Sequence, residues 1–174
     1  MDSSVSSPCL TLTDVADVIR AAKKKPRPAR GALFQSKSNN LIRRCDVVWL
    51  NPMEITDVYR KVFSAIDRIN KENWNISFDA LNTAQYTEYG IFGHYSKHID
   101  LGSGAIKNRK LSASVNLTPP SKYWGGRLET WRGNVSREIG HITVFPSYLP
   151  HRVRPVWRGR RRSLVFWATG VPFS

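Results

Sequence analysis

The sequence predicts a mainly β fold of the α+β class, in which α-helices pack on one face of an antiparallel sandwich or barrel. Two helical patterns come first along the chain of 174 residues, and a succession of short β-branched and aromatic runs follows them. Turn residues separate these runs, and no further helical pattern intervenes. Helices followed by such a series of strands are typical of a sheet structure that is covered on one side.

Two helices are expected before the main series of strands. The first lies within "TLTDVADVIRAAKKKPRPAR" (residues 11–30), where Thr13 is the expected N-cap and Pro26 stops the helix. The second covers "EITDVYRKVFSAIDRINKENW" (residues 54–74), whose apolar residues recur at helical spacing and should pack on a sheet. These apolar residues are Ile55, Val58, Val62, Phe63, Ile66 and Ile69.

The expected strands are short segments rich in β-branched or aromatic residues. The first of them, "DVVWL" (residues 46–50), precedes the second helix, and the others follow it. The later segments are residues 74–90, 111–118, 125–131, 141–147, 151–156 and 161–168.

We expect one folded domain, residues 31–174, preceded by an N-terminal helix and basic segment, residues 1–30, that is partly flexible. A chain of this length, of which 41% is hydrophobic, is long enough for one core and too short for two. Residues 1–10 are small and polar, and we expect them to be frayed. The basic run at residues 23–30 is a candidate for nucleic-acid binding, although such runs are more often solvated.

The chain is strongly basic, with 27 Lys and Arg against 13 Asp and Glu and a formal net charge of +14. Such a charge bears on partners rather than on fold, and it predicts a partner with an acidic surface. That partner is a protein or peptide substrate with acidic surroundings, or a nucleic acid or ribonucleoprotein.

Cysteine use and hydropathy indicate an intracellular protein. Cys9 and Cys45 have no metal-ligand spacing and are too few for a disulfide framework, which fits a reducing compartment. The longest apolar run is far shorter than the roughly 20 residues of a membrane helix, and no signal-peptide core is present. We therefore expect a soluble, cytoplasmic protein with no membrane partner.

A candidate metal site lies in "GHYSKHID", where His98 and Asp100 stand two positions apart. Side chains at this spacing share one face of a strand, so the pair can hold one ligand if the stretch is extended. Two histidines and one carboxylate commonly hold a metal that reacts with oxygen. His151, which opens a later strand, is the natural third ligand. His141, inside an apolar run, and His94, farther along the strand, are weaker choices.

A second candidate site follows in "RRSLVFW", where Arg161, Ser163 and Trp167 share one face if the segment is a strand. A guanidinium presents a planar fork that fits a carboxylate, and a neighbouring hydroxyl can add a hydrogen bond. A carboxylate-bearing cosubstrate is expected to dock there. The alternative is that Arg161 is one more solvated arginine of a basic segment.

Three motifs together resemble the Fe(II)- and 2-oxoglutarate-dependent dioxygenase superfamily, particularly its prolyl 4-hydroxylase-like branch. "YGIFGHYSKHID" is similar to the branch's Y-G-x-x-G-x-Y-x-x-H-x-D segment, and "YWGGRLETW" to its G-G-x-L turn and strand. "HRVRPVWRGRRRSLVFW" is similar to its H-x-V-x-P-V, G-x-R and terminal Trp pattern. The resemblance covers residues 86–168 and implies a double-stranded β-helix core of the jelly-roll, cupin-like type.

The resemblance also implies cofactors and residue roles. Fe(II), 2-oxoglutarate and O2 are implied, with ascorbate as an optional addition. The implied metal ligands and catalytic residues are His98, Asp100 and His151. The distal carboxylate of 2-oxoglutarate would pair with Arg161, assisted by Ser163, and Tyr89 would hydrogen-bond the cosubstrate. Trp167 would wall the pocket, unless it is a core tryptophan.

The implied activity is hydroxylation of a substrate, most readily a prolyl residue in a protein, with formation of succinate and CO2. The alternatives are a nucleic-acid oxygenase or demethylase, a small-molecule (amino acid) hydroxylase, and a basic binding module that has kept the fold. The charge favours nucleic acid, whose bases Trp124, Trp131 or Trp157 would stack on. The loop at residues 101–110 is expected to close over the substrate.

Overall fold

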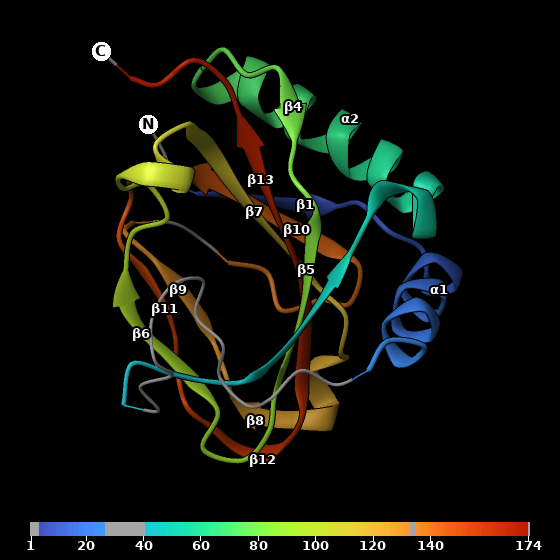
Figure 1. Cartoon of the computed structure of the whole chain (residues 1–174). Coiled ribbons are helices and arrows are strands. Elements are labelled where there is room, and N and C mark those ends of the chain that lie inside the picture. Colours follow the sequence, from blue (N-terminus) through green and yellow to red (C-terminus); the bar gives the residue numbers. More distant parts are fainter. Residues whose placement is uncertain (1–3, 27–40, 133–134, 174) are drawn as a thin grey trace.

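The computed structural model describes residues 4–26, 41–132 and 135–173 (Figure 1). Its described residues form two α-helices, α1 (Leu12–Lys23) and α2 (Thr56–Asn73), and a set of antiparallel β-sheets. Three short 3-10 helices join them: η1 (Pro52–Glu54), η2 (Gly104–Ile106) and η3 (Pro120–Lys122).

The largest sheet runs in the order β1-β10-β7-β13-β5-β3, and a short strand, β4, also pairs with β13. All of its pairs are antiparallel. The strands are β1 (Val5–Pro8), β3 (Asp46–Leu50), β4 (Ala80–Leu81), β5 (Ala84–Tyr89), β7 (Arg109–Asn116), β10 (His141–Pro146) and β13 (Arg161–Thr169).

A smaller sheet of order β2-β6-β11-β9 stands apart from the large sheet on the side away from the helices (Figure 1). The pair β8 and β12 closes the end of the molecule that is lowest in this view. These strands are β2 (Arg43–Arg44), β6 (His94–His98), β8 (Tyr123–Gly125), β9 (Leu128–Thr130), β11 (His151–Val153) and β12 (Val156–Gly159).

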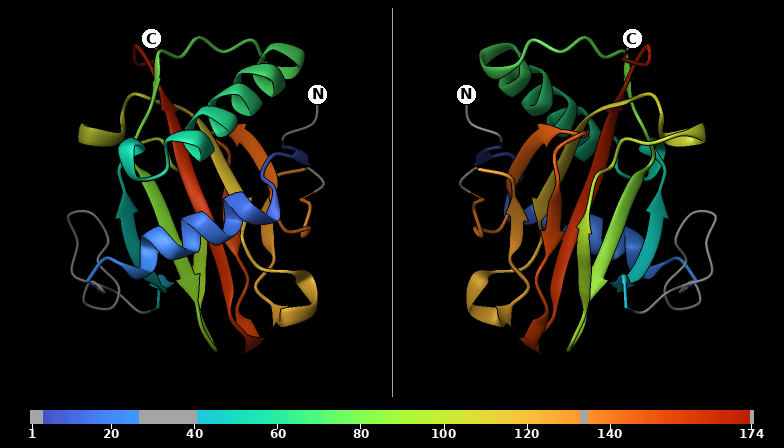
Figure 2. Two further views of the ribbon diagram at one scale, coloured as in Figure 1. Left: turned by 90° about the vertical axis from the view of Figure 1, so that its right-hand side faces the viewer. Right: turned by 90° about the vertical axis from the view of Figure 1, so that its left-hand side faces the viewer.

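Both helices cover one face of the large sheet, as Figure 2 shows. Val58, Val62, Ile66 and Ile69 recur at helical spacing on α2 and are almost completely buried. They join one apolar cluster with side chains from the covered face of the sheet. Burying each of these side chains stabilises the fold by about 1.5–3 kcal/mol. A mainly β, double-stranded β-helix architecture with helices on one face is thus confirmed.

The N-terminal residues differ from the expectation in two respects. Residues 5–8 are not frayed, because β1 pairs with β10 in the register Val5↔Val144. A backbone ladder of this kind needs no apolar side chains, so small polar residues do not prevent it. The N-cap of α1 is Thr11, not Thr13, because Asp14 lies three residues after Thr11 and completes a capping box.

Two other expectations concern parts of the chain that the structure does not describe. The expected boundary between residues 30 and 31 lies outside the described residues, as do residues 27–30 of the basic run at residues 23–30. The division into an N-terminal segment and a single domain stays a prediction. Among the described residues, no helix is both long enough and apolar enough to span a bilayer.

Candidate metal and cosubstrate site

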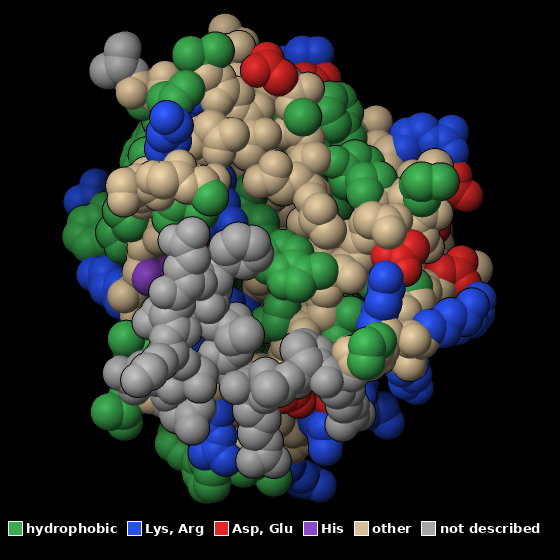
Figure 3. Space-filling view, in the orientation of Figure 1, with side chains coloured by type: hydrophobic (Ala, Val, Ile, Leu, Met, Phe, Trp, Pro, Cys, Tyr) green, Lys and Arg blue, Asp and Glu red, His purple; other side chains and the backbone are tan. Residues whose placement is uncertain are grey.

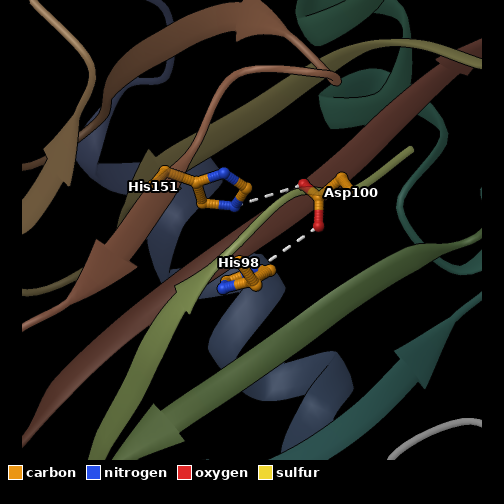
Figure 4. Close-up of side chains that lie close together, drawn as sticks. All are labelled: His98, Asp100 and His151. Carbon is orange, nitrogen blue, oxygen red and sulfur yellow. Dashed lines mark ion pairs between the residues drawn. The ribbon is translucent and has the colours of Figure 1, made fainter. Parts of the chain in front are cut away.

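His98, Asp100 and His151 meet between the two sheets (Figure 4). Their candidate ligand atoms all lie within 4.8 Å of one another. His98 ends β6 and His151 begins β11, and the antiparallel pairing of these strands places the two residues directly opposite each other. His98 Nε2 lies 3.5 Å from Asp100 Oδ1, and His151 Nε2 lies 3.4 Å from Asp100 Oδ2. Strand pairing therefore joins residues that are far apart in the sequence into one cluster.

Hydrogen bonds fix which nitrogen each histidine presents to the cluster. His98 Nδ1 lies 2.8 Å from the Ser96 carbonyl oxygen, and His151 Nδ1 lies 3.1 Å from that of Leu149. Because a carbonyl only accepts, each Nδ1 carries a proton, and each Nε2 is the nitrogen that faces Asp100 and can bind a metal ion. The Ser112 hydroxyl donates to Asp100 Oδ2 at 2.7 Å. Three oriented donors with these partners fit a divalent metal ion.

The charges of the cluster also favour a cation. Burial raises the pKa of Asp100, but hydrogen bonds and charge interactions with His151 and His98 outweigh burial and hold that pKa well below its ordinary value. Burial lowers the pKa of His151, and the hydrogen bond and attraction to Asp100 reverse this, so the net shift is upward. The carboxylate is therefore ionised, and its negative charge attracts a cation.

Aromatic rings hold the two histidines in place. The Tyr95 ring stacks on His98 with centroids 3.5 Å apart and planes 17° apart. Phe145 packs against His151 with ring centroids 4.6 Å apart. These contacts restrict rotation of both imidazoles.

A cavity of about 190 Å³ adjoins the cluster, and all four residues expected to hold the cosubstrate line it: Tyr89, Arg161, Ser163 and Trp167. The register Arg161↔Tyr89 places β13 and β5 side by side at this wall. Arg161 donates to Ser163 Oγ at 3.4 Å. The roles of these four residues stay predictions, but their common location is a fact of the fold.

Arg161 is buried, so the alternative that it is a solvated arginine is wrong. Its side chain is 4% exposed, and its guanidinium carbon lies 5.6 Å from the centre of the Tyr89 ring. Gly126 has φ +59°, and a Cβ there would lie 3.2 Å from Arg161 Cδ and 2.8 Å from Val156 Cγ2. The second glycine of "GGRL" therefore leaves room for the arginine to enter the cavity.

Trp167 is both a pocket wall and a core residue. It is 5% exposed and lines the cavity, and its ring lies 6.1 Å from that of Trp49. The guanidinium of Arg109 lies 3.9 Å from the centre of the Trp167 ring.

The weaker metal-ligand candidates lie outside the cluster. The two ring nitrogens of His94 contact the carbonyl oxygens of Phe92 and Leu41, and His141 contacts Ser136 Oγ. Arg162, the next residue after Arg161, donates from Nε to Glu88 at 2.8 Å and does not line the cavity.

The sequence reasoning missed several polar residues of the cavity, among them Arg43, Gln85, Arg109 and Ser112. Arg43 donates to Gln85 Oε1 at 2.6 Å and to Cys45 Sγ at 3.0 Å, and it is 7% exposed. Ser112 holds Asp100, and Arg109 lies over Trp167. The sequence pattern that could have predicted Ser112 is the alternation of apolar and polar residues in "LSASVN". This alternation places the polar side chains on one face of the strand and the apolar ones on the other.

Comparison with known proteins agrees with this geometry. A family model described as the 2OG-Fe(II) oxygenase superfamily matches residues 84–169. A PKHD-type hydroxylase of Paraburkholderia phymatum is 39% identical over 88 residues, which are 45% of this chain and 39% of that protein. One from Paracoccus denitrificans is 36% identical over 94 residues, 50% of this chain and 41% of that protein. The chain thus spans about two fifths of the length of the curated relatives it matches.

Solved structures show the same fold over nearly the whole chain. A prolyl-4-hydroxylase of Pseudomonas putida aligns with TM-score 0.76 and 20% identity over 98% of this chain and 94% of that chain. A prolyl hydroxylase in complex with a hypoxia inducible factor oxygen degradation domain peptide fragment from Trichoplax adhaerens aligns with TM-score 0.78 and 19% identity, covering 97% and 84%. At these identities the likeness shows the fold alone.

Proposed function

We propose that the chain is a member of the 2OG-Fe(II) oxygenase superfamily, whose family model matches residues 84–169, and that it is a hydroxylase that uses Fe(II) and 2-oxoglutarate. One observation carries the proposal: a cluster of two histidines and one carboxylate adjoins a cavity that also contains a buried arginine. His98, Asp100 and His151 would hold the metal. When bound, Fe(II) and 2-oxoglutarate supply the oxidising chemistry that uses O2 and yields succinate, CO2 and the hydroxylated product.

Arg161 would bind the distal carboxylate of 2-oxoglutarate. The part of the chain that the structure describes offers this guanidinium no carboxylate within salt-bridge distance. A buried cation without an anionic partner is costly, so a bound carboxylate would stabilise it. Ser163 and the Tyr89 hydroxyl, on the same wall, would add hydrogen bonds that orient the cosubstrate.

Apolar residues of both sheets would keep water out of the site. Leu128, Phe145 and Val153 line the cavity and are each at least nine-tenths buried. Exclusion of water strengthens the ion pair at Arg161 and limits side reactions of the oxidising centre. Ascorbate remains an optional addition in this proposal.

The preferred substrate is a prolyl residue in a protein or peptide. The names of the relatives support this choice, since the matched structures include prolyl hydroxylases and one of them was solved with a peptide. The loop at residues 101–110 contains η2, and Ile106 lines the cavity, which supports the proposal that this loop contacts the substrate. Its closure over the substrate stays a prediction.

A nucleic-acid oxygenase is the second candidate, and specific surface features favour it. Trp124, Trp131 and Trp157 are 67%, 51% and 51% exposed, and Lys97 lies 5.4 Å from the centre of the Trp131 ring. Lys and Arg side chains are spread over the face seen in Figure 3, and some of them lie at its lower end, where Figure 1 places β8 and β12. Exposed aromatic and basic side chains together suit a single-stranded nucleic acid.

Oxygenation of a cell extract tests the proposal and separates these substrates. The protein loaded with Fe(II) and 2-oxoglutarate would be incubated beside its His98→Ala variant, and peptides and nucleosides would be searched by mass spectrometry for one added oxygen. Oxygen on a proline-containing peptide, absent with the variant, is the expected result. Oxygen on a nucleoside, or loss of a methyl group there, would refute the prolyl substrate and indicate a nucleic-acid oxygenase or demethylase. Oxygen on a free amino acid would indicate the small-molecule reading.

The state of the cysteines bears on the cellular location of the protein. Both cysteines are free thiols, Cys45 buried and Cys9 half-buried, which suits a reducing compartment. We propose a cytoplasmic location on this ground.

A further inference from the structure

The proposed chemistry leaves one cationic side chain of the cavity unused. Arg109 begins β7 and lines the cavity beside the metal cluster, with its guanidinium over the Trp167 ring. Its NH1 lies 3.4 Å from the carbonyl oxygen of Asp100, a long and weak hydrogen bond. Its Nε is buried and has no hydrogen-bond partner among the described residues. Most of the hydrogen-bonding capacity of this guanidinium is therefore available.

The other two arginines of the cavity are already accounted for. Arg43 donates to Gln85 and Cys45 and lies 4.7 Å from the centre of the Tyr95 ring. Arg161 would bind 2-oxoglutarate in the proposed function. Only Arg109, of the three arginines that line the cavity, has neither a close hydrogen bond nor an assigned ligand.

The charge balance of the loaded site indicates the kind of ligand. The cavity is lined by Arg43, Arg109 and Arg161 against the single carboxylate of Asp100. The charge of a divalent metal ion is balanced by the two carboxylates of 2-oxoglutarate, and the charge of Asp100 is balanced by that of Arg161. Arg43 and Arg109 remain as an uncompensated positive charge in a space with limited water. Such a surplus favours an anionic group in the molecule that enters next.

The geometry favours a carboxylate as that anionic group. Trp167 covers one face of the Arg109 guanidinium, which leaves the edge of its plane for hydrogen bonds. A planar fork of N–H donors fits a planar carboxylate in two parallel hydrogen bonds. The cavity of about 190 Å³ must also hold the cosubstrate, so a compact anion suits it best.

We propose that Arg109 binds a carboxylate of the substrate, and that the enzyme selects substrates in which a carboxylate lies beside the carbon to be hydroxylated. The inference rests on the proposed function and narrows it. Two sources share this chemistry: the terminal carboxylate of a free or C-terminal amino acid, and the side chain of an acidic residue next to the target. Arg109 would then determine specificity, while His98, Asp100 and His151 hold the metal.

Binding of matched peptides tests the inference without turnover. Protein loaded with Mn(II) and 2-oxoglutarate would be titrated calorimetrically with acetyl-Ala-Pro and its C-terminal amide, and with acetyl-Ala-Pro-Glu-amide and its Gln form. At least one acidic peptide should bind about tenfold tighter than its neutral partner, since charged hydrogen bonds are worth about twice neutral ones. The pair that shows the preference identifies the source of the carboxylate.

Three variants isolate the role of Arg109. Arg109→Gln should abolish the preference for the acidic peptide and leave 2-oxoglutarate affinity within about twofold, and Arg109→Lys should restore part of the preference. Arg127→Gln removes the same charge from an exposed position outside the cavity and should keep the full preference. Circular dichroism and melting temperatures establish that each variant folds.

Several outcomes would overturn the inference. These are equal binding of the acidic and neutral peptides by the wild type, no binding of any peptide, or a preference that survives Arg109→Gln. A larger loss of 2-oxoglutarate affinity in Arg109→Gln than in Arg161→Gln would make Arg109 a cosubstrate anchor instead. Failure of the wild type to bind Mn(II) or 2-oxoglutarate is a separate result, which would refute the proposed function itself.

Discussion

The two faces of the large sheet share one backbone but differ in what they contact: one packs against the helices, and the other lines the cavity. On β13, Leu164 and Phe166 point to the helices and are completely buried in the apolar cluster, whereas Arg161 and Ser163 point to the cavity. One face is filled by side chains that need only shape and apolar surface. The other is kept hollow by polar side chains that are fixed by hydrogen bonds. Alternate residues of a single strand point to opposite faces of the sheet. The residues on one face therefore stabilise the fold, and those on the other face form the candidate site.

The largest effect is expected on the cavity face, from loss of a metal ligand. His98→Ala or His151→Ala should lower substrate-dependent succinate formation more than about a hundredfold, since even partners of metal ligands are worth 10–100-fold. The helix-covered core is untouched, so the circular dichroism spectrum should stay unchanged. Succinate would be measured by mass spectrometry. Activity near wild type in either folded variant would refute the metal assignment.

The reverse experiment is made on the helix-covered face. Ile66 of α2 is fully buried in the apolar cluster and does not line the cavity. Ile66→Ala should cost about 2–5 kcal/mol in the free energy of unfolding, measured by urea denaturation. The affinity for 2-oxoglutarate below the unfolding transition should remain within about twofold of wild type. A large loss of affinity in the folded variant would show that the two faces are coupled.

A substitution at Ser112 tests how strongly metal affinity depends on the hydrogen bond that a metal ligand, Asp100, receives. Ser112→Ala removes the hydroxyl that donates to Asp100 Oδ2. Metal affinity should fall about 10–100-fold, because a ligand carboxylate loses the hydrogen bond that orients it. Mn(II) titration followed by electron paramagnetic resonance measures this affinity. Ser114→Ala, which removes a hydroxyl from the same cavity wall without touching Asp100, serves as the control. Equal Mn(II) affinities in the two variants would show that the Ser112 hydroxyl does not contribute to metal binding through Asp100.

Arg161→Lys should weaken 2-oxoglutarate binding about tenfold, because a point charge replaces a planar fork that makes two hydrogen bonds. The dissociation constant would be measured by calorimetry on the Mn(II)-loaded protein. An unchanged constant would move the anchor to another residue of the cavity.

The smallest effect is expected at the cap of α1, far from the cavity. Burial raises the pKa of Asp14, but hydrogen bonds from Lys61 and Thr11 outweigh burial and lower it below 3.8. A lowered folded pKa means that the carboxylate stabilises the protein above its unfolded pKa and loses this effect as pH falls through the folded value. Asp14→Asn should cost about 1 kcal/mol at pH 7 and less below pH 4. Melting temperatures over this range check the prediction; a cost that does not change with pH would contradict it.

Much of the candidate site was predictable because its signals are local. His98 lies at the end of β6 and Asp100 two positions later, just beyond the strand, and the glycine at position 126 marks a turn with positive φ. The amphipathic spacing in α2 likewise predicts a buried face. Each of these patterns depends on a few neighbouring residues, so it can be read without knowledge of the partner strand.

The missed residues depend on register and pairing, which are not local. Arg109 reaches the cavity because the pairing of β13 with β7 shifts between Ala168 and Thr169, and such a bulge turns a side chain to the other face. Arg43 lies in a strand of two residues, too short for a periodic pattern, and its partner Gln85 is 42 positions away. Pattern reasoning on a single segment has no access to either fact.

The sequence by itself determined the amphipathic helices, the alternating strands and the residues able to ligate a metal, because side-chain period and chemistry are properties of a short segment. The tertiary structure alone decided that β1 pairs with β10, that Ser112 holds Asp100, and that Arg109 faces the cavity. These features follow from backbone pairing and strand register. A backbone ladder forms between any two strands that the fold brings together, so the side chains of one segment do not specify its partner.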